Sequence, residues 1–175
     1  MIEYVADQSD CSPQTSRKKF VLRAATAGDI TDIASLHASR FDRGWSESEI
    51  SAFFKDPVNF ILVAESEKPG IKLAGLIIAR AAAGEAEILT LATSHGLERH
   101  GIGTALVEYA CKTAASRSAG SIFLEVASVN TAACALYQRC DFTKTARRAH
   151  YYGKGQNDDA IIMCRDLCHL VDAGT

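Results

Sequence analysis

The sequence is poor in proline and tryptophan, with 3 prolines and 1 tryptophan in 175 residues. It does not have the low hydrophobicity of a disordered chain, because 47% of its residues are hydrophobic and 23% are charged. No apolar run approaches the roughly 20 residues that a membrane-spanning helix needs. A chain of this length can bury roughly two-thirds of its unfolded surface without a metal or a disulfide. The composition therefore predicts one ordinary globular domain.

Neither sign of charge is in large excess. The 19 lysines and arginines against 21 acids give a net charge of -2 at pH 7. No dense basic stripe with interleaved aromatic residues occurs, so nucleic acid is not an expected ligand. Residues 1–5 include an acid and lack the basic start and apolar core of a signal peptide. We therefore expect a cytoplasmic protein that binds neither nucleic acid nor a membrane.

The cysteines form neither a CxxC pair nor the compact framework of a short secreted chain. There are 6 of them, at positions 11, 111, 134, 140, 164 and 168. We expect them to be reduced. Cys164, Cys168 and His169 are the best candidate metal ligands, but three close neighbours on one predicted strand cannot easily converge on a tetrahedral ion. No metal site is predicted.

A tail and one domain are predicted. Residues 1–19 are polar and show no hydrophobic period, so we expect a loose tail, and residues 20–170 then form a single domain without repeats. The predicted elements are a strand at 20–23, helices starting near 26 and 46, strands at 60–64, 73–78 and 86–93, a helix at 102–115, a strand at 122–126, a helix at 132–139, and a closing hairpin of 147–152 with 160–165. Three consecutive strands imply an antiparallel meander, within a mixed α/β sheet built around a central strand-loop-helix unit.

The turn from Arg99 to Thr104, with the sequence RHGIGT, lies between a predicted strand and an amphipathic helix. Glycines at such a turn let the backbone approach a ligand, and the free N–H groups and dipole of a helix start attract phosphate. The motif predicts an anion site, although a plain helix-starting turn explains two glycines about equally well. It is neither a nucleotide-binding P-loop, which would need a lysine, nor a GxGxxG dinucleotide fingerprint.

Two more side chains are candidates for chemistry. Glu125 interrupts the apolar run at 122–126, where a carboxylate is normally excluded from a covered strand. A salt bridge or an exposed strand end explains this carboxylate about as well as a functional role does. Tyr137, on the helix predicted at 132–139, is by itself most simply a packed tyrosine whose hydroxyl touches solvent.

Together these segments resemble the GCN5-related N-acetyltransferase (GNAT) superfamily, and more closely its bacterial ribosomal-protein-alanine N-acetyltransferases of the RimI type. The resemblance runs from about residue 20 to residue 167. Each motif is modest, and the specificity comes from their order and spacing: FDRGWS at 41–46, GEAEILTLA at 84–92, LEV at 124–126 with Asn130, ALY at 135–137, RR at 147–148 with YY at 151–152, and DA at 159–160.

The resemblance implies an α/β (α+β) GNAT fold with a mixed central sheet of about six to seven strands and flanking helices. It also implies a splayed strand pair that holds acetyl-CoA as the co-substrate, without a metal. The residues that would contact the cofactor are Leu91, Ala92 and Thr93 on the splayed strand, Arg99, His100, Gly101, Ile102, Gly103 and Thr104 at the pyrophosphate, and Asn130 at the pantetheine.

The resemblance further implies that Glu125 is the general base and Tyr137 the general acid that protonates the departing thiolate. Trp45, Tyr151 and Tyr152 would wall the acceptor slot. The implied acceptor is a protein N-terminus, on a small-subunit ribosomal protein. An α-amino group with a pKa of about 7.7 to 8.0 is partly neutral near neutral pH, whereas a lysine near 10.4 is almost fully charged. Direct attack on the thioester requires no cysteine nucleophile.

One departure and several alternatives accompany this interpretation. Glu98 stands where the superfamily usually has glutamine or arginine, and a carboxylate beside a pyrophosphate is mildly repulsive, which Arg99 could partly offset. Glu85 or Glu87 could be the base instead of Glu125. A lysine side chain or a small-molecule amine could be the acceptor. A non-catalytic acetyl-CoA-binding sensor is the alternative from a different functional class.

Overall fold

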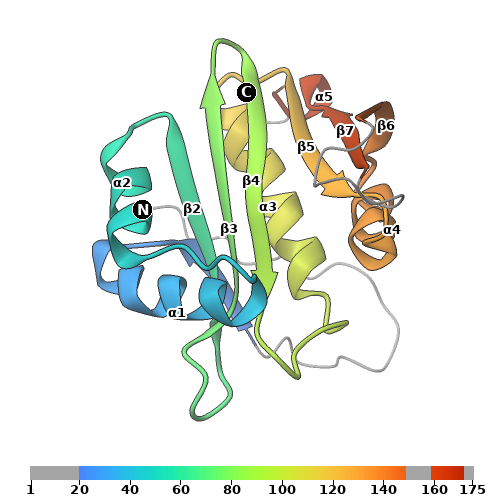
Figure 1. Ribbon diagram of the computed structural model, residues 1–175. Helices are drawn as coiled ribbons and strands as arrows, with labels where there is room; N and C mark the ends of the chain where they lie inside the picture. The colour runs from blue at the N-terminus through green and yellow to red at the C-terminus, as the bar shows by residue number, and fades with distance from the viewer. Residues whose placement is uncertain (1–19, 149–158, 172–175) are drawn as a thin grey trace, which may run out of the picture.

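The computed structural model of the protein describes residues 20–148 and 159–171, and its strands form one seven-stranded sheet (Figure 1). The strand order is β1-β2-β3-β4-β5-β7-β6. Among these described strands β4 and β5 pair in parallel, and every other neighbouring pair is antiparallel. The strands are β1 (Phe20–Ala24), β2 (Asn59–Ser66), β3 (Leu73–Ala82), β4 (Glu85–Thr93), β5 (Ser121–Ala127), β6 (Thr143–Arg148) and β7 (Ala160–Asp166).

Helices cover both faces of the sheet, as Figure 1 shows. One face carries the 3-10 turn η1 (Ala27–Asp29), α1 (Ile30–Arg40) and α2 (Glu47–Lys55), and the other carries α3 (Ile102–Ser116). Two shorter helices, α4 (Thr131–Arg139) and α5 (Cys168–Val171), pack beside α3. Within the described ranges, none of these helices is both long and apolar enough to cross a bilayer.

Local side chains explain where the first helices begin. Ser46 and Glu49 form a reciprocal capping box at the start of α2, in which the Glu49 N–H donates to Ser46 Oγ at 3.3 Å and the Ser46 N–H donates to Glu49 Oε2 at 2.8 Å. Thr26 and Asp29 form an equivalent box before α1, and the Thr26 N–H donates to Asp29 Oδ2 at 2.7 Å. Each such cap contributes about 1 kcal/mol to helix stability.

The sheet separates two apolar cores. Successive residues of a strand point to opposite faces, so neighbouring apolar residues of β2 and β3 serve different cores. The core under α3, called here the α3 core, includes Leu62, Ile77, Leu106, Ile122 and Met163. The core under the first two helices, called here the α1/α2 core, includes Ile33, Ile50, Val63, Leu76 and Ile78.

The predicted order of elements is confirmed, including the antiparallel meander of β2, β3 and β4 and the central β4-loop-α3 unit. The closing hairpin begins earlier than predicted, because β6 pairs with β7 from Thr143 opposite Cys164 onward rather than from Arg147. All of β6 is exposed, so it lacks the apolar alternation that marks a strand in sequence. Helix α5 was not predicted. The predicted tail, residues 1–19, lies outside the described residues.

A partly buried ion pair joins β1 to the start of α1. The Arg23 guanidinium donates to both carboxylate oxygens of Asp29, at 2.8 Å each. The same carboxylate also accepts from the Thr26 N–H and hydroxyl, and the Asp29 side chain is only 11% exposed. These hydrogen bonds hold the pKa of Asp29 well below its usual range, and those from Arg23 have the largest effect. The ionised form of Asp29 is therefore part of the folded state.

We expect Asp29→Asn to lower the free energy of unfolding at neutral pH by about 2 kcal/mol, because it removes charge-assisted hydrogen bonds from a buried site. The folded-state pKa is depressed, so the wild type has this stability in full above the unfolded value of about 3.9 and loses it as the pH falls. Urea unfolding across the acid range should therefore show the gap between the two proteins narrowing below about pH 4. Asp32→Asn, at an exposed ion pair with Lys72, is the matched control. Parallel curves for Asp29→Asn and wild type would contradict the prediction.

Candidate active site

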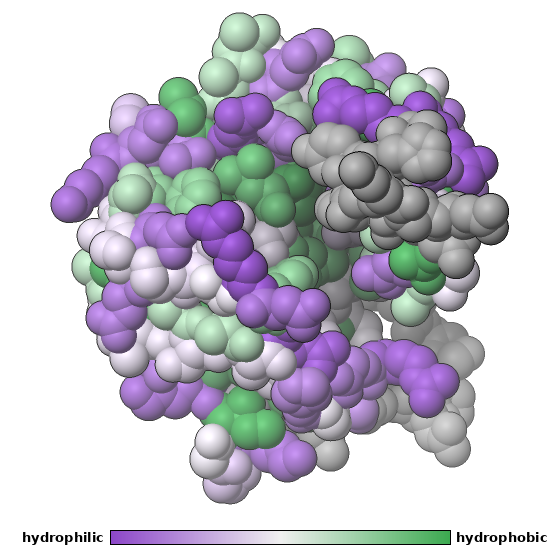
Figure 2. Space-filling view, viewed as in Figure 1, coloured by the Kyte–Doolittle hydropathy of each residue, from purple (hydrophilic) through white to green (hydrophobic). Residues whose placement is uncertain are grey.

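The parallel strands β4 and β5 separate part-way along their length. They pair from Glu85 opposite Ser121 to Ile88 opposite Leu124. Strand β4 then continues to Thr93, and β5 continues to the end of its own range, without further pairing between them in the described chain. In Figure 2 the surface is hollowed between the part that carries α1 and α2 and the part that carries β5 to β7, and apolar residues lie in the hollow. Backbone groups of β4 beyond Ile88 therefore face a gap rather than a neighbouring strand.

A β-bulge lies at the point of separation. Strand β4 shifts register against β3, so that Leu89 has no directly opposed residue. The extra residue changes which core each side chain faces: Ile88 belongs to the α3 core, whereas Ala92 belongs to the α1/α2 core and Leu91 packs on the α3 side. Because a bulge bends and twists its strand, it accounts for the divergence of β4 from β5.

A cavity of about 770 Å³ opens beside the diverging strands. Its walls come from the far half of β4, the loop before α3, the first turn of α3, and α4. The residues predicted to contact the cofactor that line this cavity are Leu91, Ala92, Thr93, Arg99, Gly101, Ile102, Gly103, Thr104 and Asn130. The fold thus brings together three separate segments of the predicted cofactor site.

The loop before α3 turns through left-handed backbone conformations at Gly96, Arg99 and Gly101, with φ of 74°, 61° and 79°. In the part of the chain that the structure describes, no side chain caps α3, and its first turn contains no acid. The N–H groups and the positive end of the dipole at this helix start can therefore bind an anion. Gly103 lets α4 approach closely, because a Cβ there would lie 2.7 Å from Leu136 Cδ1.

Two predicted cofactor contacts make hydrogen bonds of their own. His100 is exposed, and its Nδ1 lies 2.8 Å from the carbonyl oxygen of Glu98 rather than lining the cavity. Asn130 does line the cavity, but its Oδ1 accepts the Ala133 N–H at 3.1 Å and so caps α4. Only the amide NH₂ of Asn130 is then suited to donate toward a ligand.

Glu98, the departure from the superfamily pattern, is paired. Its Oε1 lies 3.0 Å from Arg40 NH1, and its Oε2 accepts the Gly96 N–H at 2.8 Å. The pKa of Glu98 lies below its ordinary value. The largest cause is the hydrogen bond from its own backbone N–H, followed by that from Gly96 and by the positive charge of Arg40. Arg40 comes from the last turn of α1 and also lines the cavity. Sequence analysis missed Arg40 because no local pattern links it to a loop so much later in the chain.

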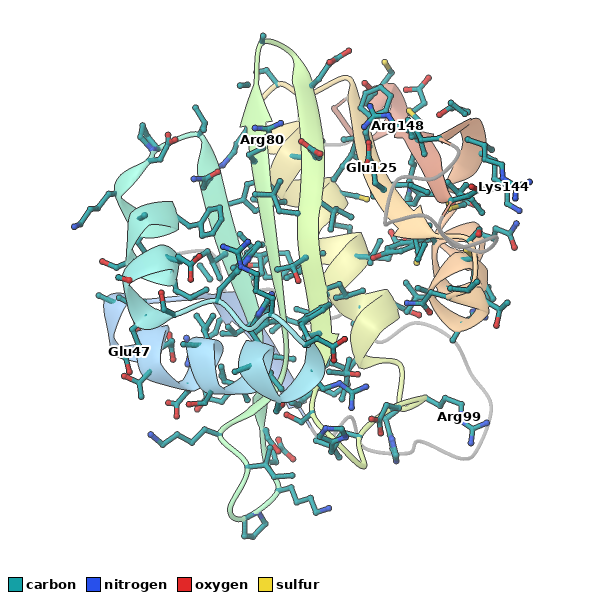
Figure 3. All side chains as sticks on the ribbon, viewed as in Figure 1. Glu47, Arg80, Arg99, Glu125, Lys144 and Arg148 are labelled. Carbon is teal, nitrogen blue, oxygen red and sulfur yellow. The ribbon has the colours of Figure 1, made fainter. Side chains whose placement is uncertain are left out.

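Glu125 is the first residue of β5 beyond its pairing with β4. Ile122, Leu124 and Val126 belong to the α3 core, so the alternation of the strand places Glu125 on the opposite face. Its side chain is 23% exposed, and its Oε1 lies 2.9 Å from Arg148 NH1. Figure 3 shows Glu125 and Arg148 beside each other. The carboxylate is tolerated in this strand because it is ion-paired and faces away from the α3 core.

Glu85 and Glu87, the alternative candidates for the base, lie where β4 and β5 are still paired. Glu87 forms an ion pair with Arg80 across the β3–β4 ladder. Glu85 is exposed at the first position of β4. Neither acid lies beyond Ile88, where the gap opens, whereas Glu125 follows the last residue of β5 that is paired with β4.

Tyr137 lies on α4 and is 7% exposed. Its ring packs against that of Phe142, with 5.7 Å between the centroids. Burial raises the pKa of Tyr137 above its ordinary value, so the phenol stays protonated at neutral pH. Its helix neighbours Ala133 and Leu136 line the cavity, which places Tyr137 on the element that bounds it. Tyr137 itself belongs to the α3 core and is not among the described residues that line the cavity.

The chain matches the acetyltransferase (GNAT) family over residues 30–142. It belongs to this family. The seven-stranded mixed sheet with flanking helices and the parting of β4 and β5 agree with the GNAT fold expected from the sequence.

Two curated relatives are named as a ribosomal-protein-alanine N-acetyltransferase and an N-alpha-acetyltransferase. The chain is 34% identical over 93 residues to [Ribosomal protein bS18]-alanine N-acetyltransferase of Escherichia coli (strain K12). That alignment covers 53% of this chain and 63% of the relative, so it spans less than two-thirds of the relative's length. The chain is also 30% identical over 146 residues to N-alpha-acetyltransferase RimI of Mycobacterium tuberculosis, covering 82% of this chain and 90% of that protein. The resemblance to the RimI type is confirmed.

A solved GNAT-type structure supports the fold independently. The crystal structure of Arabidopsis thaliana NAA60 in complex with acetyl-CoA superposes with a TM-score of 0.74 over 84% of this chain and 98% of that chain. Its sequence identity is 18%, so the likeness concerns the fold alone.

Trp45 packs in an aromatic stack and is not among the described residues that line the cavity. Its ring lies 4.5 Å from that of His37 and 4.9 Å from that of Phe53, between centroids. Trp45 therefore lies at the edge of the α1/α2 core, on the loop that joins those two helices. The other predicted acceptor residues, Tyr151 and Tyr152, lie outside the described residues.

His37 ties this loop to β4. Its Nδ1 accepts the Trp45 N–H at 3.0 Å, so Nε2 carries the proton and donates to Thr90 Oγ1 at 3.3 Å. The imidazole is 3% exposed, and burial lowers the pKa of His37 below its ordinary value. A protonated ring could no longer accept from Trp45. The position of the α1–α2 loop therefore depends on a neutral His37.

We expect acidification to destabilise the fold through His37. Its folded-state pKa is depressed, so the stability linked to the neutral ring is complete above the unfolded value of about 6.5 and is lost as the pH falls. Thermal unfolding can be followed between about pH 8 and pH 5 by tryptophan fluorescence, because Trp45 is the single tryptophan of the sequence. The unfolding temperature of His37→Gln should fall less over this range than that of wild type. His100→Gln, outside the stack, should retain the wild-type dependence; equal dependence in wild type and His37→Gln would refute the assignment.

Proposed function

We propose that this protein is an acetyl-CoA-dependent N-alpha-acetyltransferase that transfers an acetyl group to the N-terminal amine of a protein by direct attack on the thioester. The observation that carries the proposal is the parting of β4 and β5 directly beside a cavity that ends at an open helix start. Family membership and the names of the relatives support it.

The residues of the cavity suit acetyl-CoA. The N–H groups of Gly101 to Thr104 suit the pyrophosphate, because they gather at a helix start without a competing acid in the first turn. The apolar side chains of Leu91 and Leu136 suit the pantetheine arm, whose amides can pair with the backbone of β4 beyond Ile88. When bound, acetyl-CoA supplies an activated acyl group as a thioester. The proposal includes no metal.

Glu125 and Tyr137 divide the proton transfers between them. A nucleophilic amine must lose a proton as its nitrogen bonds to carbon, and the Glu125 carboxylate can accept that proton directly or through one water. The Tyr137 hydroxyl can donate to the sulfur as negative charge develops there. The two groups come from different elements, one on β5 next to the gap and one on α4. Arg148, paired with Glu125, keeps a positive charge beside the carboxylate.

The acceptor that we propose is a protein N-terminus, on a small-subunit ribosomal protein in the cytoplasm. An α-amino group, with a pKa of about 7.7 to 8.0, already supplies the neutral nucleophile at neutral pH. A site with one partly exposed carboxylate is adequate for such an amine. A lysine, with a pKa near 10.4, would require more help to deprotonate. The E. coli relative is named for the alanine of ribosomal protein bS18, which points to the same acceptor class.

The proposal predicts a preference for free N-termini. Peptides that begin with alanine, serine or threonine should be acetylated in the presence of acetyl-CoA, whereas N-terminally blocked peptides with an internal lysine should not. Release of free thiol, with mass spectrometry of the peptides, measures both. Acetylation of only lysine or a small amine would show a different acceptor and reject the N-terminal assignment. Binding of CoA without turnover on any acceptor would indicate the sensor instead.

The assignment of Glu125 and Tyr137 predicts that Glu125→Gln and Tyr137→Phe each slow turnover by about 10²- to 10⁴-fold, because each removes one proton-transfer group. Affinity for CoA, measured by calorimetry, should change little. Glu87→Gln tests the rival base on β4, and Tyr109→Phe on α3 is the matched phenol control. A large loss in Glu87→Gln with a normal rate in Glu125→Gln would transfer the role of base to Glu87.

A further inference from the structure

An acid lies in the wall of the cavity at the end where a pyrophosphate would bind. Glu98 lines the cavity together with Arg99 and Gly101. Its carboxylate would repel an anion unless another group compensates it. We propose that Arg40 provides this compensation: it neutralises Glu98 from α1, so that the loop before α3 presents a net positive charge to the pyrophosphate of CoA. This inference rests on the function proposed above.

The Arg40 side chain is held in place by Glu98 and His95. Its NH1 lies 3.0 Å from Glu98 Oε1 and 2.6 Å from His95 Nδ1. The His95 Nε2 lies 3.1 Å from the carbonyl oxygen of Ser39 and donates to it, which leaves Nδ1 as the acceptor for Arg40. Arg40 is 25% exposed, so two partner side chains and partial burial restrict a side chain that is usually mobile.

Both oxygens of the Glu98 carboxylate have partners. Its second oxygen, Oε2, accepts the Gly96 N–H at 2.8 Å, within the loop itself. The carboxylate is thus held between the loop backbone and α1. Figure 3 shows Arg99 on this loop, ahead of α3. Neither the loop backbone nor Arg99 needs to rearrange for the anion to meet the N–H groups at the start of α3.

The charges beside the loop before α3 explain why Arg40 matters for anion binding. Glu98 is the single acid among the described residues that line the cavity, and its arginines are Arg40, Arg99 and Arg139. On the loop before α3, Glu98 and Arg99 alone would cancel, so the pairing of Arg40 with Glu98 leaves the charge of Arg99 uncompensated there. Arg40 also lies in the last turn of α1, where a cation is favoured by that helix's own dipole. The sequence position usually held by glutamine or arginine can therefore be an acid in this chain.

Calorimetric titration of the full chain with CoA tests the inference, on wild type, Arg40→Met, Glu98→Gln and the double variant. We expect Arg40→Met to weaken CoA binding by about tenfold, because it leaves the Glu98 carboxylate uncompensated. Glu98→Gln should bind at least as tightly as wild type. The double variant should recover to within about threefold of wild type, because the repulsion is removed together with its compensation. Wild-type binding should also weaken more steeply with added salt than binding by Arg40→Met.

Arg43→Met is the matched control, because Arg43 is 89% exposed on the same side of the fold and pairs with Glu49 at 3.7 Å. It should leave CoA affinity unchanged, and circular dichroism should show every variant folded. Unchanged affinity in Arg40→Met would overturn the inference. The inference would also be overturned if the double variant bound CoA as weakly as Arg40→Met, or if Glu98→Gln lost as much affinity as Arg40→Met. Either result would mean that the Arg40–Glu98 pair only stabilises the structure of the loop. Failure of wild type to bind CoA would overturn the proposed function as well.

Discussion

Strands β4 and β5 share a ladder only from Glu85 to Ile88, and the candidate site depends on where that ladder stops. Backbone N–H and C=O groups must find partners when they leave water, so a strand edge without a neighbour can accept a ligand that hydrogen-bonds as a strand would. The bulge at Leu89 sets this limit, since it bends β4 while keeping it paired with β3. The cavity and the position of Glu125 at its unpaired point on β5 both follow from the divergence.

The two proposed proton-transfer groups lie in contrasting environments. Glu125 faces away from the α3 core and is partly exposed beside Arg148. Tyr137 is buried on α4, where a neutral phenol is favoured over its anion. Arg40 and Glu98 form a second ion pair, in the cavity wall before α3. The Glu98 carboxylate is tolerated there because Arg40 is fixed beside it.

The sequence interpretation succeeded where the signal was local. Apolar alternation located β2 to β5, the capping residues Thr26 and Ser46 located two helix starts, and the glycine turn located the start of α3. It missed the start of β6, whose six residues are all exposed, because pairing rather than burial defines that strand. Glu125 looked anomalous only because a buried run was assumed to be covered on both faces.

The sequence by itself determined the family, the order of elements and the segments that line the cavity, because these depend on periodicity, capping and motifs within a few residues of one another. Tertiary structure alone decided which distant charges meet. Arg40 reaches Glu98, Arg148 reaches Glu125 and His37 reaches Thr90 from other elements of the fold. No pattern along the chain encodes such pairs, since an ion pair or hydrogen bond acts over a few ångströms in space regardless of separation in sequence.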